Sequence, residues 1–534
     1  MRLFYHFGHL AVVVAVSLGV ACGGVTSRDG AYEGDTAEGT SSGEEVTLDS
    51  ESEPVGSFSL SSPMAQKYST SVKKEDTAQV RFSAQVTADG RLTRAARDLV
   101  EISGAGFPIM TPAIREVLWW HGIPEAGYEV ALFKRGSETS LHEAVEEWLN
   151  GQAETGFNRY GIAMRQLEGG VEAAVISVKS RFHIIPLQRR VSGPRKIRVE
   201  GRVDAPYKSV SFSLTTPHGE TIEPETKLRG NQFVCTFRAR EPGVWQIEIL
   251  GVGPRGPTAL ANFPVAVGVP VESTVEIRSF ELESEDPEVL ERSLFQAINR
   301  ERSRKGQADL EWSRDLGRVA RDYSEEMAKS GIIAHVSSIS GSVSDRVRAA
   351  SIKFAAVSEN LARARTASEA HEGLMGSPAH RANILNSRFS EVGVGVALVD
   401  EGGEKAVIVT QIFTQIRTPI EPDTVTKDVI RIINERRKDE GRRQLDEDRW
   451  LARTARKLSR KCFKDKKPHI PSVDSRFKSV KVVLFKTTNP NVAAKKVTGL
   501  YESEQTHIGV GVKEGHDSKL DEEVVCVIVL LGRQ

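Results

Sequence analysis

Apolar residues recur with the spacing of an amphipathic helix over Glu288–Lys305 and again over Leu316–Ser330. Gly306 and Gly331 follow these two segments directly, and a glycine at this position predicts the end of a helix. A third helix is predicted over Ser368–Met375. Together the three segments predict a helix-rich stretch in the middle of the chain.

Two apolar runs follow these helices and have the length and composition of buried strands. They cover Val392–Val399 and Val407–Phe413, and Glu401-Gly402-Gly403 lies between them as a turn signal. The segment therefore predicts a β-hairpin packed beneath the helices, which is typical of an α/β domain.

A different pattern occupies Lys196–Gly268, where short alternating strands are separated by turn signals at residues 204–206, 217–219 and 242–243. About seven short strands in this space favour an immunoglobulin-like β-sandwich. We assign it to residues 191–271. Cys235 lies in the middle of one alternating strand and is expected to be buried.

The chain also repeats itself. Ile298–Leu310 matches Ile433–Leu445, and Val392–Val396 matches Ile508–Val512. The offset falls from 135 (433 minus 298) to 116 (508 minus 392), so the second copy lacks 19 residues in its middle. Residues 272–418 and 419–534 are therefore predicted to be two copies of one domain, the second of them degenerate.

A weaker third copy precedes them in residues 81–190. Leu92–Asp98 matches Leu316–Asp322, and Tyr160–Met164 with Val171–Val178 resembles the glycine-containing hairpin. The alternative is an unrelated α/β segment that shares only an amphipathic helix and a hairpin.

Residues 1–22 predict a signal peptide, because an apolar run over Leu10–Val20 is too short to span a bilayer and is followed by small residues. Cys22 resembles the lipidated cysteine of a lipobox, although Gly19 replaces the preferred leucine. Cleavage with release, or an uncleaved anchor, are the alternatives. Residues 23–80 begin with an acidic, Gly- and Ser-rich stretch and predict a disordered tether.

Length and charge narrow the classes of protein further. A chain of 534 residues is too long to fold around a single hydrophobic core, so several domains are expected. Lys and Arg together number 72, as do Asp and Glu, so nothing indicates a nucleic-acid partner. Besides Cys22 and Cys235, the chain has only Cys462 and Cys526, which is too few for a disulfide scaffold. Their core-like positions favour two separately buried thiols over a bridge.

Five motifs occur in a fixed order in the middle copy. They are AHV around His335, SENLA around Glu359, GSPAHRANIL over Gly376–Leu385, EVGVGV from Glu391 and VTQIF from Val409. In this order they resemble the CAP superfamily, also called the SCP or cysteine-rich secretory protein domain, in its bacterial form. The resemblance implies an α-β-α sandwich for residues 272–418 and an extracytoplasmic location.

The resemblance also implies a cleft formed by His335, Glu359 and His380. Two neutral imidazoles can bind Zn²⁺, with affinity expected to fall below about pH 6, and a nearby carboxylate can orient them or complete a three-ligand site. Members of the family in eukaryotes have a second glutamate in this cleft, and its place falls near Ser377 in this chain, so that acid is missing here. Glu391, at the start of the following strand, is the candidate substitute. His335 capping its helix and Glu359 bonding loop amides are the structural alternatives. Residues expected to serve the fold are Asn360, Ser377, Arg381, Asn383, Gly393 and Gly395.

We therefore expect an envelope-anchored protein whose CAP domain binds a lipid, a glycan or a protein, with a divalent metal in the His/Glu cleft. The anchor would be a lipid, in the outer membrane if the host has two membranes, and secretion is the alternative. A protease-like, metal-assisted hydrolase and a structural adhesion module are the rivals. The absence of an HExxH motif and of a nucleophile motif favours binding over catalysis. The number of subunits is left open.

Overall fold

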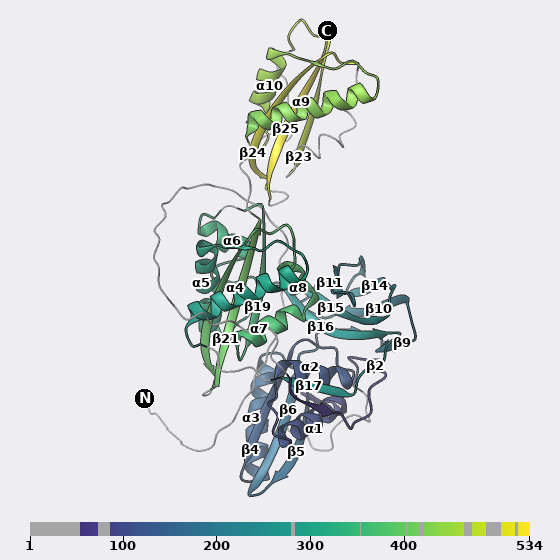
Figure 1. Cartoon of the computed structure of the whole chain (residues 1–534), viewed down its shortest axis with the longest axis vertical. Helices are drawn as coiled ribbons and strands as arrows, with labels where there is room; N and C mark the ends of the chain where they lie inside the picture. Colours follow the sequence, from purple (N-terminus) through teal and green to yellow (C-terminus); the bar gives the residue numbers. More distant parts are fainter. Residues whose placement is uncertain are drawn as a thin grey trace. The chain divides into compact units, whose positions relative to one another are not determined.

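Figure 1 shows the computed structural model of this protein, coloured along the chain. The structure describes residues 54–72, 86–278, 284–352, 354–401, 404–415, 421–463, 473–487, 504–517 and 522–534. The described residues fall into two compact units. One holds the described residues up to Ala350 together with Ser358–Thr414, and the other holds Ser351–Val357 together with Gln415–Gln534. The predicted signal peptide and Cys22 lie outside the described residues.

The N-terminal domain, residues 86–180, is a four-stranded sheet with helices on both faces. Its elements are β3 (Thr87–Ala88), α1 (Gly90–Gly104), α2 (Thr111–Trp120), β4 (Tyr128–Arg135), α3 (Glu138–Glu154), β5 (Arg159–Leu167) and β6 (Gly170–Val178). Alternate residues of β6 serve two cores: Ala174 and Ile176 pack with α1 and α2, whereas Ala173 and Val175 pack with α3. The two-residue period of a strand produces this division.

The β-domain, residues 182–278, contains two sheets around one apolar core. The first sheet has β7 (Phe182–Ile184), β10 (Arg195–Val203), β13 (Thr226–Arg229) and β14 (Gln232–Ala239). The second has β9 (Arg190–Val191), β11 (Ser209–Thr215), β12 (Thr221–Ile222), β15 (Gly243–Gly253) and β16 (Gly256–Val267). Inward side chains of both sheets, including Phe212, Phe233, Trp245 and Phe263, form the core, and Cys235 is a buried free thiol within it.

The central domain, residues 284–415, carries the motifs. Its elements are α4 (Pro287–Arg304), β18 (Glu311–Trp312), α5 (Arg314–Ser330), α6 (Val343–Ala349), β19 (Ala356–Ala364), α7 (Ala367–Met375), α8 (Pro378–Ile384), β20 (Glu391–Glu401) and β21 (Glu404–Gln415). The three helices and the hairpin predicted from periodicity are confirmed. Every residue from Ala406 to Phe413 of β21 is buried, so protein covers both faces of this strand.

The C-terminal domain, residues 421–534, has the same layered plan. Its described elements are α9 (Pro422–Asp439), β22 (Asp446–Glu447), α10 (Arg449–Ser459), β23 (Ser479–Thr487), β24 (His507–Asp517) and β25 (Glu522–Arg533). Odd-numbered residues of β25, such as Val527 and Val529, pack with α9. Even-numbered ones, such as Ile528 and Leu530, pack with α10.

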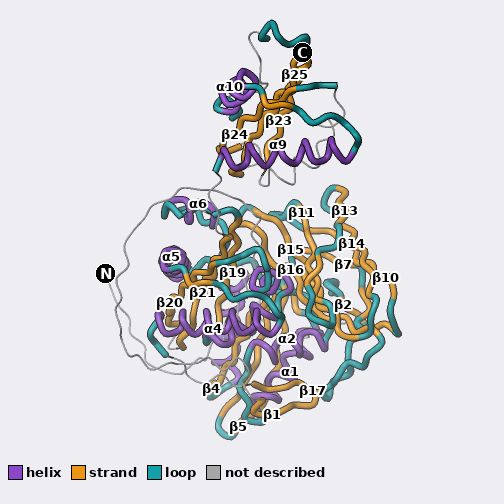
Figure 2. Tube along the Cα trace, turned by 45° about the horizontal axis from the view of Figure 1, so that its top comes forward, coloured by secondary structure: helices purple, strands orange, loops and turns teal. Residues whose placement is uncertain are grey.

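The sheets of the N-terminal, central and C-terminal domains have equivalent strand orders. The orders are β3-β5-β6-β4, β18-β20-β21-β19 and β22-β24-β25-β23, and in each the first two strands run parallel. Figure 2 shows the strands β23, β24 and β25 of the C-terminal sheet in orange. The central and C-terminal domains also share a contact: the side-chain amide of Asn299 bonds both backbone groups of Leu310, and that of Asn434 does the same with Leu445. Both pairs are 135 residues apart, the predicted offset. These features support the repeat, which stays a prediction.

Glycines of the repeated hairpin let a helix lie directly on a strand. A Cβ at Gly393 would lie 2.2 Å from the backbone of Leu316, and one at Gly395 would lie 2.0 Å from that of Arg321. Gly509 and Gly511 make equally close approaches to α10. A side chain at these positions would push the helix off the sheet, which explains the Gly-x-Gly pattern in physical terms.

Two expectations are corrected by the structure. The disordered tether was expected to reach residue 80, but β1 (Pro54–Ser59) pairs with β17 (Thr274–Arg278), and β2 (Lys67–Tyr68) pairs with β8 (Leu187–Gln188). Leu60 and Tyr68 are buried, so enough apolar surface is covered to offset the cost of ordering.

The second correction concerns the cysteines. Cys462 and Cys526 form a disulfide instead of two separate thiols, because α10 and β25 bring their Cα atoms to 6.5 Å.

None of the helices in the described part of the chain is both long enough and apolar enough to cross a bilayer.

Candidate functional site

His335, Glu359 and Arg346 form a chain of buried polar contacts in the central domain. His335 follows α5 in a loop, and its Nδ1 lies 2.6 Å from Oε2 of Glu359 on β19. The other carboxylate oxygen, Oε1, accepts a hydrogen bond from the Arg346 guanidinium on α6. Glu359 is fully buried, and both of its oxygens are therefore engaged by cationic or imidazole groups. This arrangement fixes the orientation of the His335 ring and leaves Nε2 as the nitrogen that Glu359 does not engage.

Tyr323 of α5 supports the same cluster from below. The Arg346 guanidinium lies 3.3 Å from the centroid of the Tyr323 ring, a cation–π geometry. The Tyr323 hydroxyl donates a hydrogen bond to the carbonyl of Ala334, next to His335. Burial raises the pKa of Tyr323 above its ordinary value, so this hydroxyl stays protonated as a donor.

An amide network holds the helix that carries His380. Asn360 donates through Nδ2 to the backbone carbonyl of His380, 3.2 Å away, and to Oε1 of Gln411, 3.0 Å away. Its Oδ1 accepts from Nδ2 of Asn383 at 2.9 Å. Asn360, Asn383 and Gln411 thus tie β19, α8 and β21 together.

His380 is fully buried on α8, and neither ring nitrogen has a hydrogen-bond partner among the described residues. Burial and then the charge of His335 lower the pKa of His380 to about 3. Nε2 of His335 and Nε2 of Gln411 are likewise buried without a partner in the described part of the chain. Such groups are rare in folded proteins because each costs free energy to desolvate.

Glu248 of the β-domain contacts the start of the helix that carries His380. Ser377 accepts from the His380 backbone N–H as the N-cap of α8, and its own hydroxyl donates to Oε1 of Glu248 on β15 at 2.8 Å. The backbone N–H of Ala379 also donates to Glu248, at 3.0 Å. Arg381, one residue beyond His380, donates to the carbonyl of Gly219 in the same domain at 3.3 Å.

The β15–β16 hairpin lies against His335 from the same side. The backbone N–H groups of His335 and Val336 both donate to the carbonyl of Arg255, each at 3.2 Å. Gly256 follows with φ +90, and a Cβ there would lie 3.0 Å from Cβ of His335. The β-domain therefore contributes to the burial of both histidines, and His335 is only 4% exposed.

Glu391 is not joined to this cluster. It begins β20, where it pairs with Glu311 of β18, and its carboxylate accepts from the Thr414 hydroxyl at 3.3 Å. Burial raises its pKa, and the charges of Glu311 and Asp315 add to this effect. Strand β21 separates β20 from β19 in the sheet, so Glu391 lies on a different strand from Glu359 and not beside it.

Sequence reasoning missed several members of the site. Arg346, Gln411, Glu248 and Gly256 were not singled out, although Gln411 lies inside the VTQIF motif and a signal was present there. It also missed His371 on α7, which is buried with neither nitrogen partnered among the described residues. Burial lowers the pKa of His371 to about 4.

The residues present fit a metal only through the two imidazoles. The described residues contain no group of three or more His, Cys, Asp or Glu side chains placed to hold an ion. Glu359 is committed to Arg346 and His335, so it orients His335 instead of acting as a third ligand. His335 and His380 have unpartnered nitrogens, and these could hold a Zn²⁺ ion whose other ligands come from elsewhere.

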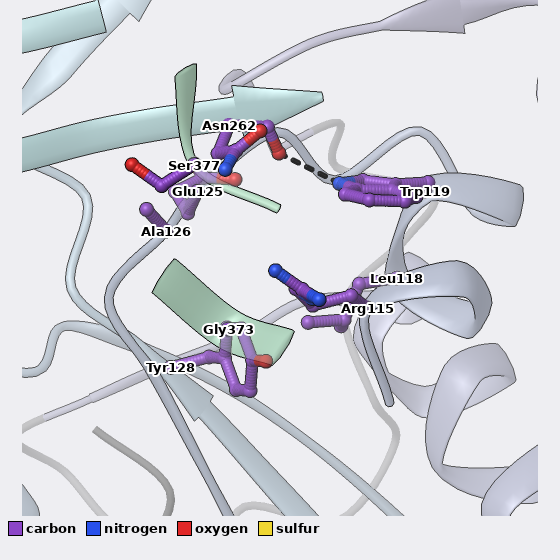
Figure 3. A pocket seen from close by; sticks show the side chains of 9 residues that line it. All are labelled: Arg115, Leu118, Trp119, Glu125, Ala126, Tyr128, Asn262, Gly373 and Ser377. Atoms are coloured by element: carbon purple, nitrogen blue, oxygen red, sulfur yellow. Dashed lines mark hydrogen bonds between the residues drawn. The ribbon is translucent and has the colours of Figure 1, made fainter. Parts of the chain in front are cut away.

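A separate cavity of about 20 Å³ lies where the N-terminal, β- and central domains meet (Figure 3). The guanidinium of Arg115 occupies its middle, with Asn262 and Ser377 on one side and Tyr128 and Gly373 on the other. Trp119 donates to the backbone carbonyl of Asn262 at 2.7 Å. A space of this size corresponds to about one water molecule, so it is a packing feature and not a ligand pocket.

Comparison with known proteins agrees with the motifs. The model of the cysteine-rich secretory protein family, CAP, matches residues 295–413. The uncharacterized membrane protein YlbC of Bacillus subtilis is 35% identical over 107 residues, 20% of this chain and 31% of that protein. The uncharacterized protein YkwD of the same organism is 32% identical over 106 residues, 20% of this chain and 41% of that protein. The chain thus spans less than half the length of these relatives.

Among solved structures, an extracellular protein containing an SCP domain from Bacillus anthracis shares 16% identity with this chain. The similarity covers 44% of this chain and 86% of that one, with a TM-score of 0.23. The family match and the order of the motifs both fall on the central domain. Residues 295–413 therefore correspond to a CAP domain.

Proposed function

We propose that this chain is an extracytoplasmic CAP-domain protein that binds a ligand at the His335–His380 site. One observation carries the proposal: three buried imidazole nitrogens and the Gln411 amide nitrogen have no partner among the described residues. Because unpaired buried polar groups are costly, their concentration in one place favours a ligand or metal that satisfies them. The ligand class is a lipid, a glycan or a protein, with a divalent metal such as Zn²⁺ held by the two imidazoles.

Binding is favoured over hydrolysis by the state of Glu359. A general base must have a free carboxylate oxygen within reach of the attacking water. Both oxygens of Glu359 are occupied, by Arg346 and by His335, and Glu391 lies elsewhere in the sheet. The metal-assisted hydrolase therefore has the weaker support.

Burial changes the pH range over which His380 is expected to act as a ligand to Zn²⁺. An ordinary imidazole becomes protonated below about pH 6.5 and ceases to be a ligand. Because burial lowers the pKa of His380 to about 3, its ring stays neutral and available well below pH 6. We therefore expect His380 to remain a potential metal ligand at pH 6.

Calorimetric titration of the full chain with Zn²⁺ tests the site. We expect His335→Gln and His380→Gln each to abolish most of the binding, since each removes one of two protein ligands. His371→Gln is the matched control, because it also removes a buried, unpartnered imidazole of the same domain. Equal Zn²⁺ binding by the wild type and the two cleft variants would eliminate the metal proposal.

An extracytoplasmic location is supported by the Cys462–Cys526 disulfide, since structural disulfides persist in oxidising compartments. We further propose that Cys22 is lipidated and anchors the chain to the envelope, with secretion as the alternative. The test is fractionation of cells that express Cys22→Ala. Movement from the membrane to the soluble fraction is expected, and unchanged partitioning with unchanged processing would disprove the anchor.

We propose that the N-terminal and C-terminal domains are degenerate CAP copies, and that the β-domain between the N-terminal and central domains is an immunoglobulin-like spacer. The shared strand order and the paired Asn299 and Asn434 contacts support the copies. The C-terminal domain has no helix matching α8 among its described residues, so we expect it to fold without binding metal. An adhesive, purely structural role is the third candidate for the assembly.

A further inference from the structure

Four cationic side chains line a groove at one end of the β-domain. Arg195 and Lys196 begin β10, Arg238 lies near the end of β14, and Arg240 follows that strand. Pro194 and Ala239 complete the lining of the groove, which has a volume of about 440 Å³. All four cations are exposed, and β10 and β14 lie side by side (Figures 1 and 2).

No carboxylate among the described residues pairs with the cations of this groove. Among the described residues, none of the four cations has an ion pair, a hydrogen bond or a cation–π contact. Lys196 and Arg238 lie directly opposite each other on antiparallel strands, where like charges destabilise a sheet. Glu241, the acidic residue nearest in sequence, pairs with His218 at 3.1 Å.

Cations elsewhere on the same strand are paired. Arg198 donates to Glu200, and Arg202 lies 3.8 Å from Asp204. On β10, Arg198 and Arg202 therefore have carboxylate partners, whereas the cations at the groove have none among the described residues. Because the chain as a whole carries no net charge, the groove is a local concentration of positive charge and not part of a generally basic surface.

From this arrangement we propose that the groove binds an anionic glycan strand that carries sulfate, phosphate or carboxylate groups. Such groups accept the paired N–H donors of a guanidinium, and their charge would relieve the repulsion between Lys196 and Arg238. A concave, polar groove fits a hydrated polymer. A bilayer surface would favour a basic face with apolar side chains to insert, and the lining supplies only Pro194 and the buried Ala239. The site is separate from the histidine site and does not depend on it.

The test is binding of the full chain to heparin, used as the sulfated glycan probe, at physiological salt. The variant Arg238→Ala/Arg240→Ala is compared with Lys227→Ala/Arg229→Ala. The second pair removes the same charge from exposed positions of the neighbouring strand β13, outside the groove. We expect the groove pair to bind at least about tenfold more weakly, and the control pair to change little.

Three results would overturn the proposal. Absence of heparin binding by the wild type would do so, and so would equal weakening by the groove pair and the control pair, which indicates general charge attraction. The third is groove-dependent binding to vesicles of phosphatidylglycerol and phosphatidylcholine without binding to heparin, because it assigns the groove to a lipid headgroup. Circular dichroism and melting midpoints confirm that the variants are folded, as expected for substitutions of exposed side chains.

Discussion

The hydroxyl of Ser377 donates a hydrogen bond of 2.8 Å to the carboxylate of Glu248, and this contact joins the CAP domain to the β-domain. Ser377 also caps the helix that begins with Pro378 and carries His380. The position of a candidate site residue therefore depends on a side chain from another domain, about 130 residues earlier in the chain.

Replacing Ser377 by alanine removes both the helix cap and a donor to a buried carboxylate. We expect Ser377→Ala to lower the free energy of unfolding by about 1–3 kcal/mol, the range for a lost cap and an under-satisfied buried group. Urea titration measures it. Ser313→Ala is the matched control, since Ser313 occupies the N-cap of α5 without a side-chain cap bond. Equal losses in the two variants would show that the Glu248 contact contributes nothing.

Glu248 should make stability depend on pH. Burial raises the pKa of Glu248 to about 7, against the hydrogen bonds from Ala379 and Ser377 that lower it. Because the pKa of Glu248 is higher in the folded than in the unfolded state, the native state binds this proton more tightly, which stabilises it. This contribution to the free energy of unfolding is fully present below about pH 4.5 and is lost as pH rises through 7. From pH 5 to pH 8 it amounts to about 2 kcal/mol.

We therefore expect Glu248→Gln to flatten this part of the pH dependence of the unfolding free energy, because an amide does not titrate. The exposed Glu223→Gln variant should keep the wild-type slope. A Glu248→Gln profile that runs parallel to the wild type between pH 5 and pH 8 would contradict the assignment.

Gly256 should control how closely the hairpin covers His335. A side chain there is strained by the positive φ, at a cost of about 1–2 kcal/mol, and its Cβ would also press on His335. In Gly256→Ala we expect faster hydrogen exchange at the amides of His335 and Val336, which donate to Arg255. Gly106→Ala is the control, because Gly106 has φ +84 but a Cβ there meets nothing within 4 Å. Unchanged protection in Gly256→Ala would show that the hairpin tolerates the added methyl group.

The disulfide should stabilise the C-terminal domain. Cys462 and Cys526 are 64 residues apart, and closing a loop of that length contributes roughly 4 kcal/mol in the chain-entropy model. We expect Cys462→Ala/Cys526→Ala to lower the unfolding free energy of this domain by that order. Alkylation of the denatured, unreduced chain should label Cys235 but neither bridge cysteine. Labelling of Cys462 or Cys526 before reduction would rule out the bridge.

The sequence by itself determined the local elements and the resemblance of the central domain to the CAP family. The helices over Pro287–Arg304 and Arg314–Ser330 follow from a period of 3.6 residues, and the hairpin after Glu391 follows from two apolar runs separated by a turn signal. Neighbouring positions encode both patterns. The order of the motifs around His335, Glu359 and His380 was sufficient to indicate a CAP domain, because each motif is a short, contiguous string.

Only the tertiary structure decided which side chains meet. Arg346 engages Glu359, Glu248 of the β-domain contacts the start of the His380 helix, Glu391 lies on a different strand, and residues 54–72 are ordered by strands far along the chain. Each contact joins segments whose spacing in the sequence has no period. Its formation depends on how sheets and helices from separate domains pack, and on the free energy of burying polar groups, which local pattern does not encode.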